Sequence, residues 1–284
     1  MLGEKALDLI DIMLPVVSEN IESWDAVLRL MRIRRYCMAV GRIISGRSVP
    51  VFRIRNLARD LFEKSEIESA VTEISRIDGI FRRTMAESSE DIVYTDPEIE
   101  AFSVISIMND LSLECIPVAR DGNVLGVVSE ISVIEELKRF IPLDISALDI
   151  ATKDVETVDS EAPLEEVIGL MIQKGFRRIP VHDSERRIIG LVTMLDIVAE
   201  IADQYRVHGE LKTLDMLSRP ISRMRYLQKP VFIDLETSLR EATEVLLRSS
   251  VGCVLAGSKE SIVGIITERD IIRFLRKEII RSID

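Results

Sequence analysis

The sequence contains few of the residues on which catalysis and metal binding usually depend. Only 2 histidines occur in 284 residues. Neither His182 nor His208 has a nucleophile or a carboxylate partner near it in sequence, so both are expected to be structural. The chain has no P-loop, GxSxG elbow or HExxH motif. We therefore predict that the protein is not an enzyme and has no metal site and no catalytic cofactor.

The sequence also lacks the hydrophobic run of roughly 18 residues that crosses a bilayer. Its first residues, MLGEKALDLIDIM, mix acids with apolar residues and do not look like a signal peptide. The 3 cysteines have neither CxxC spacing nor the pattern of a disulfide framework. These absences predict a cytoplasmic protein with reduced cysteines and no membrane partner.

Basic residues are outnumbered, with 37 Lys and Arg against 48 Asp and Glu and a formal net charge of −11. Nucleic-acid binders gain most of their affinity when Lys and Arg neutralise phosphates. The basic run RIRRY at 32–36 lies at the end of an amphipathic helix, where positive charge complements the helix dipole. We therefore expect no nucleic-acid partner.

What the sequence does contain is an internal repeat. Its signature is a glycine, two apolar residues, Ser or Thr, two variable residues and Asp. The signature appears as GLVTMLD from Gly190 and as GIITERD from Gly264. A weaker copy, GVVSEIS, starts at Gly126, and a degenerate copy, PVFRIRN, starts at Pro50. The signature thus organises nearly the whole chain.

Each signature is preceded by a helix-like apolar pattern and a short strand: CMAV, CIPV, RIPV or CVLA. In the third copy Pro163 suits the start of the helix and Gly175 suits its end. In the fourth copy Ser238 and Glu241 predict a capping box. The predicted order within a copy is strand, helix, strand, strand, helix.

The predicted fold class is α/β, with four α+β repeats. A copy of about 60 residues is too small to bury its sheet and both helices alone, so the copies should pair through their sheets. We place the repeats at 1–63 (divergent), 78–140, 141–203 and 215–284, paired as 1–140 and 141–284.

The three cysteines occupy one equivalent place in three of the copies. Cys37, Cys115 and Cys253 each begin the core strand, and the third copy has Arg178 there. We expect three buried thiols that pack as small apolar residues. A metal site is the alternative, but no His or Asp cluster accompanies the cysteines.

Together these features resemble the cystathionine-β-synthase (CBS) domain family over nearly all of the chain. The stretch PLEEVIGLMIQKGFRRIPVHDSERRIIGLVTMLDIV carries the resemblance best, and LREATEVLLRSSVGCVLAGSKESIVGIITERDII also carries it. The arrangement is similar to stand-alone archaeal proteins with four CBS domains in two Bateman modules, and to the γ subunit of AMP-activated protein kinase. The resemblance implies a regulatory protein that binds AMP, ADP, ATP or S-adenosylmethionine and signals to an effector protein or to another copy of itself.

The third copy offers the groups that a nucleotide needs. The guanidinium groups of Arg177 and Arg178 suit phosphate oxygens. Asp196 can accept hydrogen bonds from ribose hydroxyls, and Thr193 starts a helix whose N-terminus favours anions. We expect these residues to form one pocket. In the alternative interpretation, Thr193 and Asp196 only cap the helix.

The fourth copy is a second candidate nucleotide site. Thr267 and Asp270 keep the signature, but Gly252 and Cys253 replace the two arginines. Arg269 could instead reach a phosphate that is bound between paired repeats.

The N-terminal pair departs further from the signature. Its second copy has Glu114 at a phosphate position, where a carboxylate repels phosphate, and Ser132 in place of the ribose-binding Asp. Its first copy has Arg53 and Asn56 where Thr and Asp are expected. We predict that this pair is empty, altered in ligand or adapted to a partner.

Two other functions stay open at this point. The repeats could form an interaction scaffold that binds no small molecule. They could also bind S-adenosylmethionine, although Arg177 and Arg178 suit phosphate better than a sulfonium cation.

Overall fold

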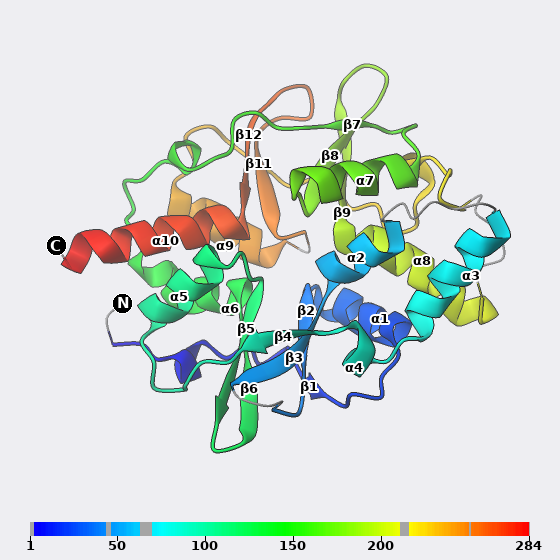
Figure 1. Ribbon diagram of the computed structural model, residues 1–284. Coiled ribbons are helices and arrows are strands. Elements are labelled where there is room, and N and C mark those ends of the chain that lie inside the picture. The colour runs from blue at the N-terminus through cyan, green and yellow to red at the C-terminus, as the bar shows by residue number, and fades with distance from the viewer. Residues whose placement is uncertain (1–2, 44–46, 63–69, 211–215, 250, 284) are drawn as a thin grey trace.

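The computed structural model describes residues 3–43, 47–62, 70–210, 216–249 and 251–283. It contains four repeats of strands and helices, which confirms the predicted α/β class (Figure 1). Within the described residues, no helix is long and apolar enough to cross a membrane.

The N-terminal half contains repeats 1 and 2. Repeat 1 consists of β1 (Val16–Val17), α1 (Ser23–Ile33), β2 (Cys37–Val40), β3 (Ser48–Arg53) and α2 (Ile54–Phe62). The connection to repeat 2 contains α3 (Ala70–Arg82) and α4 (Met85–Ser88). Repeat 2 consists of β4 (Glu90–Val93), α5 (Ala101–Asp110), β5 (Cys115–Arg120), β6 (Asn123–Ser129) and α6 (Glu130–Leu137). Strand β4 joins the sheet of repeat 1, whose order is β1-β2-β3-β4, and leaves β5-β6 as a two-stranded sheet.

The C-terminal half contains repeats 3 and 4, whose sheets follow one plan. Repeat 3 consists of β7 (Val158–Asp159), α7 (Leu164–Lys174), β8 (Arg178–His182), β9 (Ile188–Thr193) and α8 (Met194–His208). Repeat 4 consists of β10 (Phe232–Ile233), α9 (Leu239–Arg248), β11 (Cys253–Gly257), β12 (Ile262–Thr267) and α10 (Glu268–Ile283). In both sheets a short parallel strand and an antiparallel strand flank the central strand. Short 3-10 turns lie at Ala6–Leu9, Lys138–Phe140, Ala147–Asp149 and Ile221–Arg223.

The helix ends confirm the signals in the sequence. Helix α7 starts after Pro163 and ends at Gly175, which has a φ of 73°. A side chain at this φ is strained, so glycine is the favoured residue for the turn. Helix α9 begins with a capping box in which Ser238 and Glu241 bond each other's backbone N–H groups.

The helices form a layer between the two halves of the molecule. In Figure 1 the strands of repeats 3 and 4 lie above this layer and those of repeats 1 and 2 lie mainly below it. Helix α1 packs on α8, and α10 packs on α5 and α6. One core cluster therefore joins repeats 1 and 3, and a second joins repeats 2 and 4. Because each core crosses between the halves, the two halves are held together by buried apolar surface.

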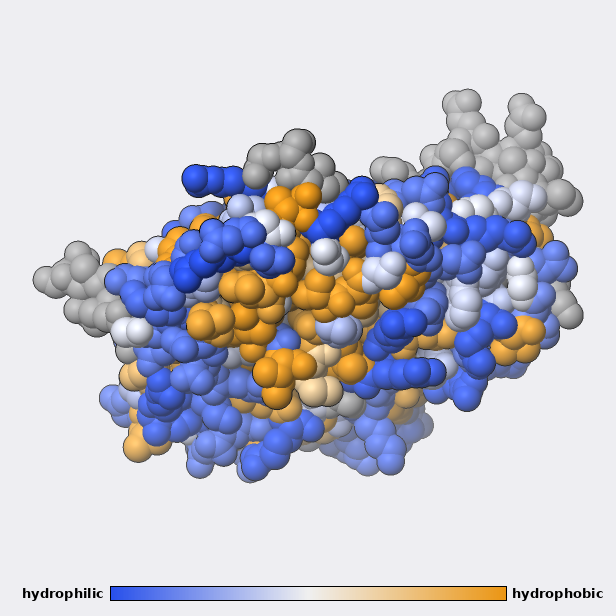
Figure 2. Space-filling view, turned by 90° about the horizontal axis from the view of Figure 1, so that it is seen from below, coloured by the Kyte–Doolittle hydropathy of each residue, from blue (hydrophilic) through white to orange (hydrophobic). Residues whose placement is uncertain are grey.

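The face below the N-terminal sheets is partly apolar. Figure 2 shows hydrophobic residues gathered in the middle of this face and hydrophilic residues around them. Among the exposed large hydrophobic residues of the chain are Ile12 and Met13 in the N-terminal segment and Leu125 in β6.

Candidate functional site

The segment that enters each repeat pairs with the last strand of the neighbouring repeat. Thr152 and Ile265 exchange two main-chain hydrogen bonds of 2.9 Å, and Gln228 and Leu191 do the same. In the N-terminal half, the N–H of Asp11 donates to the oxygen of Val127 at 2.8 Å, and Glu90 lies opposite Val51 in the β3–β4 ladder. Four side chains thus hold equivalent positions beside the strand-to-helix junction of the partner repeat, and we call them the crossing residues: Asp11, Glu90, Thr152 and Gln228.

Three crossing residues bind the junction that they face. Gln228 Nε2 donates to Asp196 Oδ1 at 3.1 Å. Asp11 Oδ2 accepts from Ser129 Oγ at 2.5 Å, and Glu90 Oε1 accepts from Arg53 Nη1 at 2.5 Å. The side chain of Thr152 makes no hydrogen bond with any described residue. The fourth junction is therefore the one that its crossing residue leaves open.

A cavity of about 270 Å³ lies at this open junction, between repeats 3 and 4. Thr152 and Val155 line it from the segment that enters repeat 3, and Phe176 lines it from the turn between α7 and β8. Repeat 4 supplies Ile265 of β12 and the first turn of α10. The apolar side chains among these can contact the faces of an aromatic base.

Thr267 and Asp270 line the cavity, and one carboxylate oxygen of Asp270 accepts no hydrogen bond from a described residue. Asp270 Oδ2 accepts from the Thr267 N–H at 2.8 Å and from Thr267 Oγ1 at 2.7 Å, which caps α10. Within the described chain, Asp270 Oδ1 has an ion pair with the exposed Arg273 at 3.9 Å and no hydrogen bond. Asp270 Oδ1 can therefore accept a hydrogen bond from a ligand.

Three arginines that line the cavity have unused donors. Arg177 Nη1, Arg269 Nη2 and Arg55 Nε are buried and have no hydrogen-bond partner within the described residues. Burial lowers the pKa of Arg55, and Glu114 at 3.5 Å opposes this effect only in part. Buried donors without partners cost stability, so an anion in the cavity would be favourable.

Arg178 also lines the cavity, but two of its three guanidinium nitrogens are bound by protein groups. Its Nη2 donates to Glu268 Oε2 at 2.6 Å and its Nε to the oxygen of Val251 at 2.5 Å. Arg177 donates to Glu130 Oε2 at 2.6 Å. Burial would lower the pKa of Arg178, but the nearby Glu268 carboxylate outweighs it, so the pKa is raised. Two glutamates thus neutralise much of the positive charge that the sequence led us to assign to a phosphate.

The structure does not bring all four residues of the third copy together. Arg177 and Arg178 lie at the cavity with Thr267, Arg269 and Asp270, whereas Thr193 and Asp196 are fully buried at a different junction. There Asp196 Oδ2 accepts from the N–H and the hydroxyl of Thr193, so the predicted capping box is confirmed. Asp196 Oδ1 accepts from Arg34 Nη1 at 2.7 Å and from Gln228.

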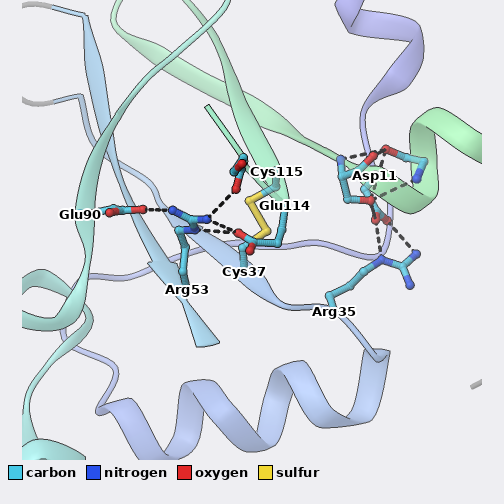
Figure 3. Close-up of a disulfide and its surroundings, with 10 residues drawn as sticks. Asp11, Arg35, Cys37, Arg53, Glu90, Glu114 and Cys115 are labelled. Carbon is cyan, nitrogen blue, oxygen red and sulfur yellow. Dashed lines mark hydrogen bonds and ion pairs between the residues drawn. A yellow bond between two sulfur atoms is a disulfide. The ribbon is translucent and has the colours of Figure 1, made fainter. Parts of the chain in front are cut away.

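The N-terminal pair fills both of its junctions with ion pairs. Arg35 binds Asp11 at 2.6 Å beside Ser129. Arg53 donates to Glu90 and, from Nε, to Glu114 Oε2 at 2.7 Å (Figure 3). Burial alone would raise the pKa of Glu114, but the charges of Arg53, Arg177 and Arg55 outweigh it, and the pKa is lowered.

The prediction of three reduced cysteines is wrong for two of them. Cys37 and Cys115 form a disulfide between repeats 1 and 2 (Figure 3). The pairing of the repeats brings the equivalent starts of β2 and β5 to a Cα separation of 6.6 Å, within reach of a disulfide. In the C-terminal pair the equivalent residues are Arg178 and Cys253, so no such bond can form. Burial raises the pKa of the Cys253 thiol to about 12, so this thiol stays protonated.

Thr152 and Arg55 are among the cavity residues that the sequence analysis missed. Thr152 lies in an irregular segment before β7, and only its equivalence to Gln228 shows its importance. Arg55 comes from α2 in repeat 1, and no sequence pattern connects it to a site in repeats 3 and 4.

Known proteins are similar to this chain in sequence and in architecture. The family model "CBS domain" matches residues 85–139, 147–203 and 222–277, which together exceed half of the chain. These matches fall on repeats 2, 3 and 4. Repeat 1 lies outside them, in agreement with its divergent signature.

Two of the relatives are archaeal proteins. The chain is 28% identical over 113 residues to protein MK0525 of Methanopyrus kandleri, covering 38% of the chain. It is 26% identical over 162 residues to protein MJ1225 of Methanocaldococcus jannaschii, covering 56% of the chain. Each alignment spans 57% of the relative's own length.

A solved structure has the same four-repeat fold over almost the whole chain. The crystal structure of MJ1225, described as a proposed archaeal homologue of γ-AMPK, superposes with a TM-score of 0.77 at 16% identity. The match covers 95% of this chain and 99% of that structure. A protein of Pyrococcus horikoshii also matches, with a TM-score of 0.59 at 11% identity, over 96% of this chain and 100% of that one.

Proposed function

Because this chain belongs to the CBS domain family, we propose that it is a non-catalytic regulatory protein that binds one adenine nucleotide, AMP, ADP or ATP, in the cavity between repeats 3 and 4. One observation carries the proposal. The cavity is lined by Asp270, whose Oδ1 accepts no hydrogen bond from a described residue, and by arginines with guanidinium nitrogens that have no hydrogen-bond partner among the described residues. A ribose phosphate needs this combination of one acceptor and several cationic donors.

The cavity suggests how the parts of the nucleotide are held. The ribose hydroxyls donate to Asp270 Oδ1, while Thr267 keeps the carboxylate in place through Oδ2. The phosphate accepts hydrogen bonds from Arg177 Nη1 and Arg269 Nη2. The base lies among the apolar side chains of Val155, Phe176 and Ile265. Each part of the ligand then meets the chemistry that it requires.

Binding would couple both halves of the protein. Arg55 of repeat 1 lines the same cavity and donates from Nη2 to the oxygen of Gly175 at 3.3 Å. A phosphate that also engages Arg55 contacts the N-terminal half as well as repeats 3 and 4. The ligand would favour the arrangement in which these contacts form. We propose that an effector protein or a second copy of the chain responds to that arrangement.

The cavity favours a nucleotide over S-adenosylmethionine. Six cationic side chains and three carboxylates line it. A sulfonium ligand without phosphate would leave the arginine donors unsatisfied and add positive charge beside them. A phosphorylated nucleotide reduces both costs.

Calorimetric titration with AMP, ADP, ATP, adenosine and S-adenosylmethionine tests the proposal. We expect one nucleotide to bind per chain, and Asp270→Asn to weaken it about 10- to 100-fold, as expected when a hydrogen bond to a charged group is lost. Asp196→Asn is the matched control, because it disturbs an equivalent cap away from the cavity. No nucleotide binding by the folded wild type would favour the interaction scaffold instead.

A further inference from the structure

We infer that the apolar face formed by the N-terminal segment and β6 is a docking surface for a partner protein whose contact segment combines large apolar side chains with lysines and arginines. We call this surface the lower apolar face, and its exposed members are Leu7, Ile12, Met13 and Leu125. None of these residues lines the cavity between repeats 3 and 4, so the inference does not rest on the proposed function.

The turn at the centre of this face is apolar in repeat 1, where the other repeats are charged. The residue that follows the crossing residue is Asp91, Lys153 or Lys229 in repeats 2, 3 and 4. In repeat 1 it is Ile12, which is 94% exposed, and the next residue, Met13, is 52% exposed. The fold therefore accepts charge at this position and does not require an apolar residue. Apolar residues gathered on a surface indicate a contact with another molecule.

The turn is held by its main chain and by Asp11. The Met13 N–H donates to Asp11 Oδ1 at 3.0 Å, and the Leu14 N–H donates to the oxygen of Asp11 at 3.1 Å. Arg35 in turn binds the Asp11 carboxylate at 2.6 Å, and Leu14 is buried. Because the turn is fixed in this way, the Ile12 and Met13 side chains are presented before a partner arrives, and binding costs little ordering.

Neighbouring elements extend the apolar surface. Ile10 forms an antiparallel bridge with Val128, which places the N-terminal segment along β6. Leu125 of β6 is 45% exposed, and Leu7 of the 3-10 turn at Ala6–Leu9 is 50% exposed. Figure 2 shows hydrophobic residues in the middle of this side of the molecule and hydrophilic residues around them. An apolar centre with a polar rim is typical of a protein interface.

The polar residues on these segments are mainly acidic. Carboxylates are exposed on the 3-10 turn, on the residues that pair with it and at the tip of the β5–β6 hairpin: Asp8, Asp96, Glu98, Glu100 and Asp121. The basic side chains of the same segments already have carboxylate partners, since Lys5 lies 3.9 Å from Glu100 and Arg120 lies 2.8 Å from Asp96. The excess of negative charge favours a partner with positive charge.

A basic amphipathic segment fits this face better than other occupants do. A second copy of the chain would bring the same carboxylates against each other, and its net charge of −11 would add to the repulsion. Anionic lipid head groups would be repelled in the same way. A segment that carries apolar side chains among lysines and arginines covers the apolar centre and pairs with the acidic rim.

A model peptide tests this chemistry. The probe is a fluorescent helical peptide of about 18 leucines and lysines with one apolar side, titrated with the full chain in the absence of nucleotide and followed by fluorescence anisotropy. We expect Ile12→Lys/Met13→Asp to weaken binding at least about tenfold. This variant reproduces Lys153 and Asp154, which follow Thr152 in repeat 3, and it leaves the net charge unchanged. It therefore removes the apolar contact alone.

A matched variant and a second peptide provide the controls. Ile189→Lys/Leu235→Asp makes the same charge changes at exposed apolar positions of the C-terminal half and should bind the peptide as the wild type does. A peptide of leucines and glutamates should bind the wild type at least about tenfold more weakly. Circular dichroism confirms that each variant is folded. Equal affinity of Ile12→Lys/Met13→Asp and the wild type, or no peptide binding by the wild type, would overturn the inference.

Two further measurements separate the other occupants. A wild-type dimer in sedimentation that Ile12→Lys/Met13→Asp dissociates would assign the face to self-association. Binding to vesicles of phosphatidylcholine and phosphatidylserine that this variant loses would assign it to a membrane. We expect neither result, and either would overturn the inference. AMP titration of the same variant should match the wild type, so the nucleotide proposal stands or fails separately.

Discussion

Gln228 and Thr152 hold equivalent positions in the C-terminal half, yet Gln228 reaches the aspartate of its junction and Thr152 does not. Both are held by paired main-chain hydrogen bonds of 2.9 Å to the last strand of the neighbouring repeat. The Gln228 amide extends to Asp196 Oδ1 at 3.1 Å, whereas Thr152 lines an open cavity with Asp270. The closed junction therefore differs from the open one in its longer crossing residue and in Arg34, which also donates to Asp196 Oδ1 at 2.7 Å.

Lengthening Thr152 should close the open junction. In Thr152→Gln the new amide can donate to Asp270 Oδ1, as Gln228 does to Asp196. We expect AMP affinity to fall at least about tenfold, which corresponds to about 1.4 kcal/mol. Calorimetric titration measures this change, with Thr152→Ser as the control that keeps a short side chain. Equal affinity in Thr152→Gln and the wild type would contradict our view of the crossing residues.

Removing Arg269 should weaken phosphate binding selectively. Arg269 lines the cavity and its buried Nη2 has no hydrogen-bond partner among the described residues, and a hydrogen bond from this nitrogen to a phosphate would be worth about 1.5–3 kcal/mol. We expect Arg269→Ala to weaken AMP about 10- to 150-fold and to leave adenosine almost unchanged. Arg281→Ala, an exposed site on the same helix, is the matched control. Equal losses for AMP and adenosine would rule out the phosphate role.

Glu114 should make stability depend on acidity. Its folded-state pKa lies below the ordinary value of 4.5, so the ionised carboxylate stabilises the fold at neutral pH. This contribution is lost as the pH falls below about 4.5 and through the lowered pKa. Glu114→Gln should lower stability at pH 7 by about 3–5 kcal/mol, because it leaves buried arginines without their partner, and should flatten the acid dependence.

Urea unfolding at several pH values checks this expectation. The exposed Glu98 provides the control, since Glu98→Gln removes one carboxylate without disturbing a buried pair. A wild-type profile with the same slope as that of Glu114→Gln below pH 4.5 would show that the buried pair does not contribute.

The disulfide should stabilise the N-terminal pair. It closes a loop with a sequence separation of 78 residues, and such cross-links typically contribute about 2–4 kcal/mol. We expect Cys37→Ala/Cys115→Ala to lower the free energy of unfolding by this amount and to remove the effect of a reducing agent. The Cys253→Ala variant keeps the disulfide, so a reducing agent should still lower its free energy of unfolding. Titration of three free thiols in the denatured, unreduced wild type would disprove the bond.

The local pattern of the sequence predicted most of the fold. Short signatures such as GLVTMLD determine a strand, a cap and a helix within a few residues, because hydrogen bonds such as those between Thr193 and Asp196 are local. The same logic identified the end of α7 at Gly175. These features do not depend on which repeats become neighbours.

The candidate site could be predicted only in part. The signature identified Thr267, Arg269 and Asp270, and the resemblance identified Arg177 and Arg178, all of which line the cavity. On the sequence alone, Asp196 had equal or greater weight as a ligand-binding residue. In the structure, Asp196 Oδ1 accepts a hydrogen bond from Arg34, a residue 162 positions away along the chain. A long-range contact of this kind leaves no periodic signal in the sequence.

The sequence by itself therefore determined the four repeats, their capped helices and the chemical groups available at each junction, because these follow from interactions between residues close together in the chain. Only the tertiary structure decided which junction stays open, which cysteines bond and which arginines keep unused donors. Those outcomes depend on side chains from different repeats that meet when the sheets and helices pack, and their reach and charge balance exist only in the folded molecule.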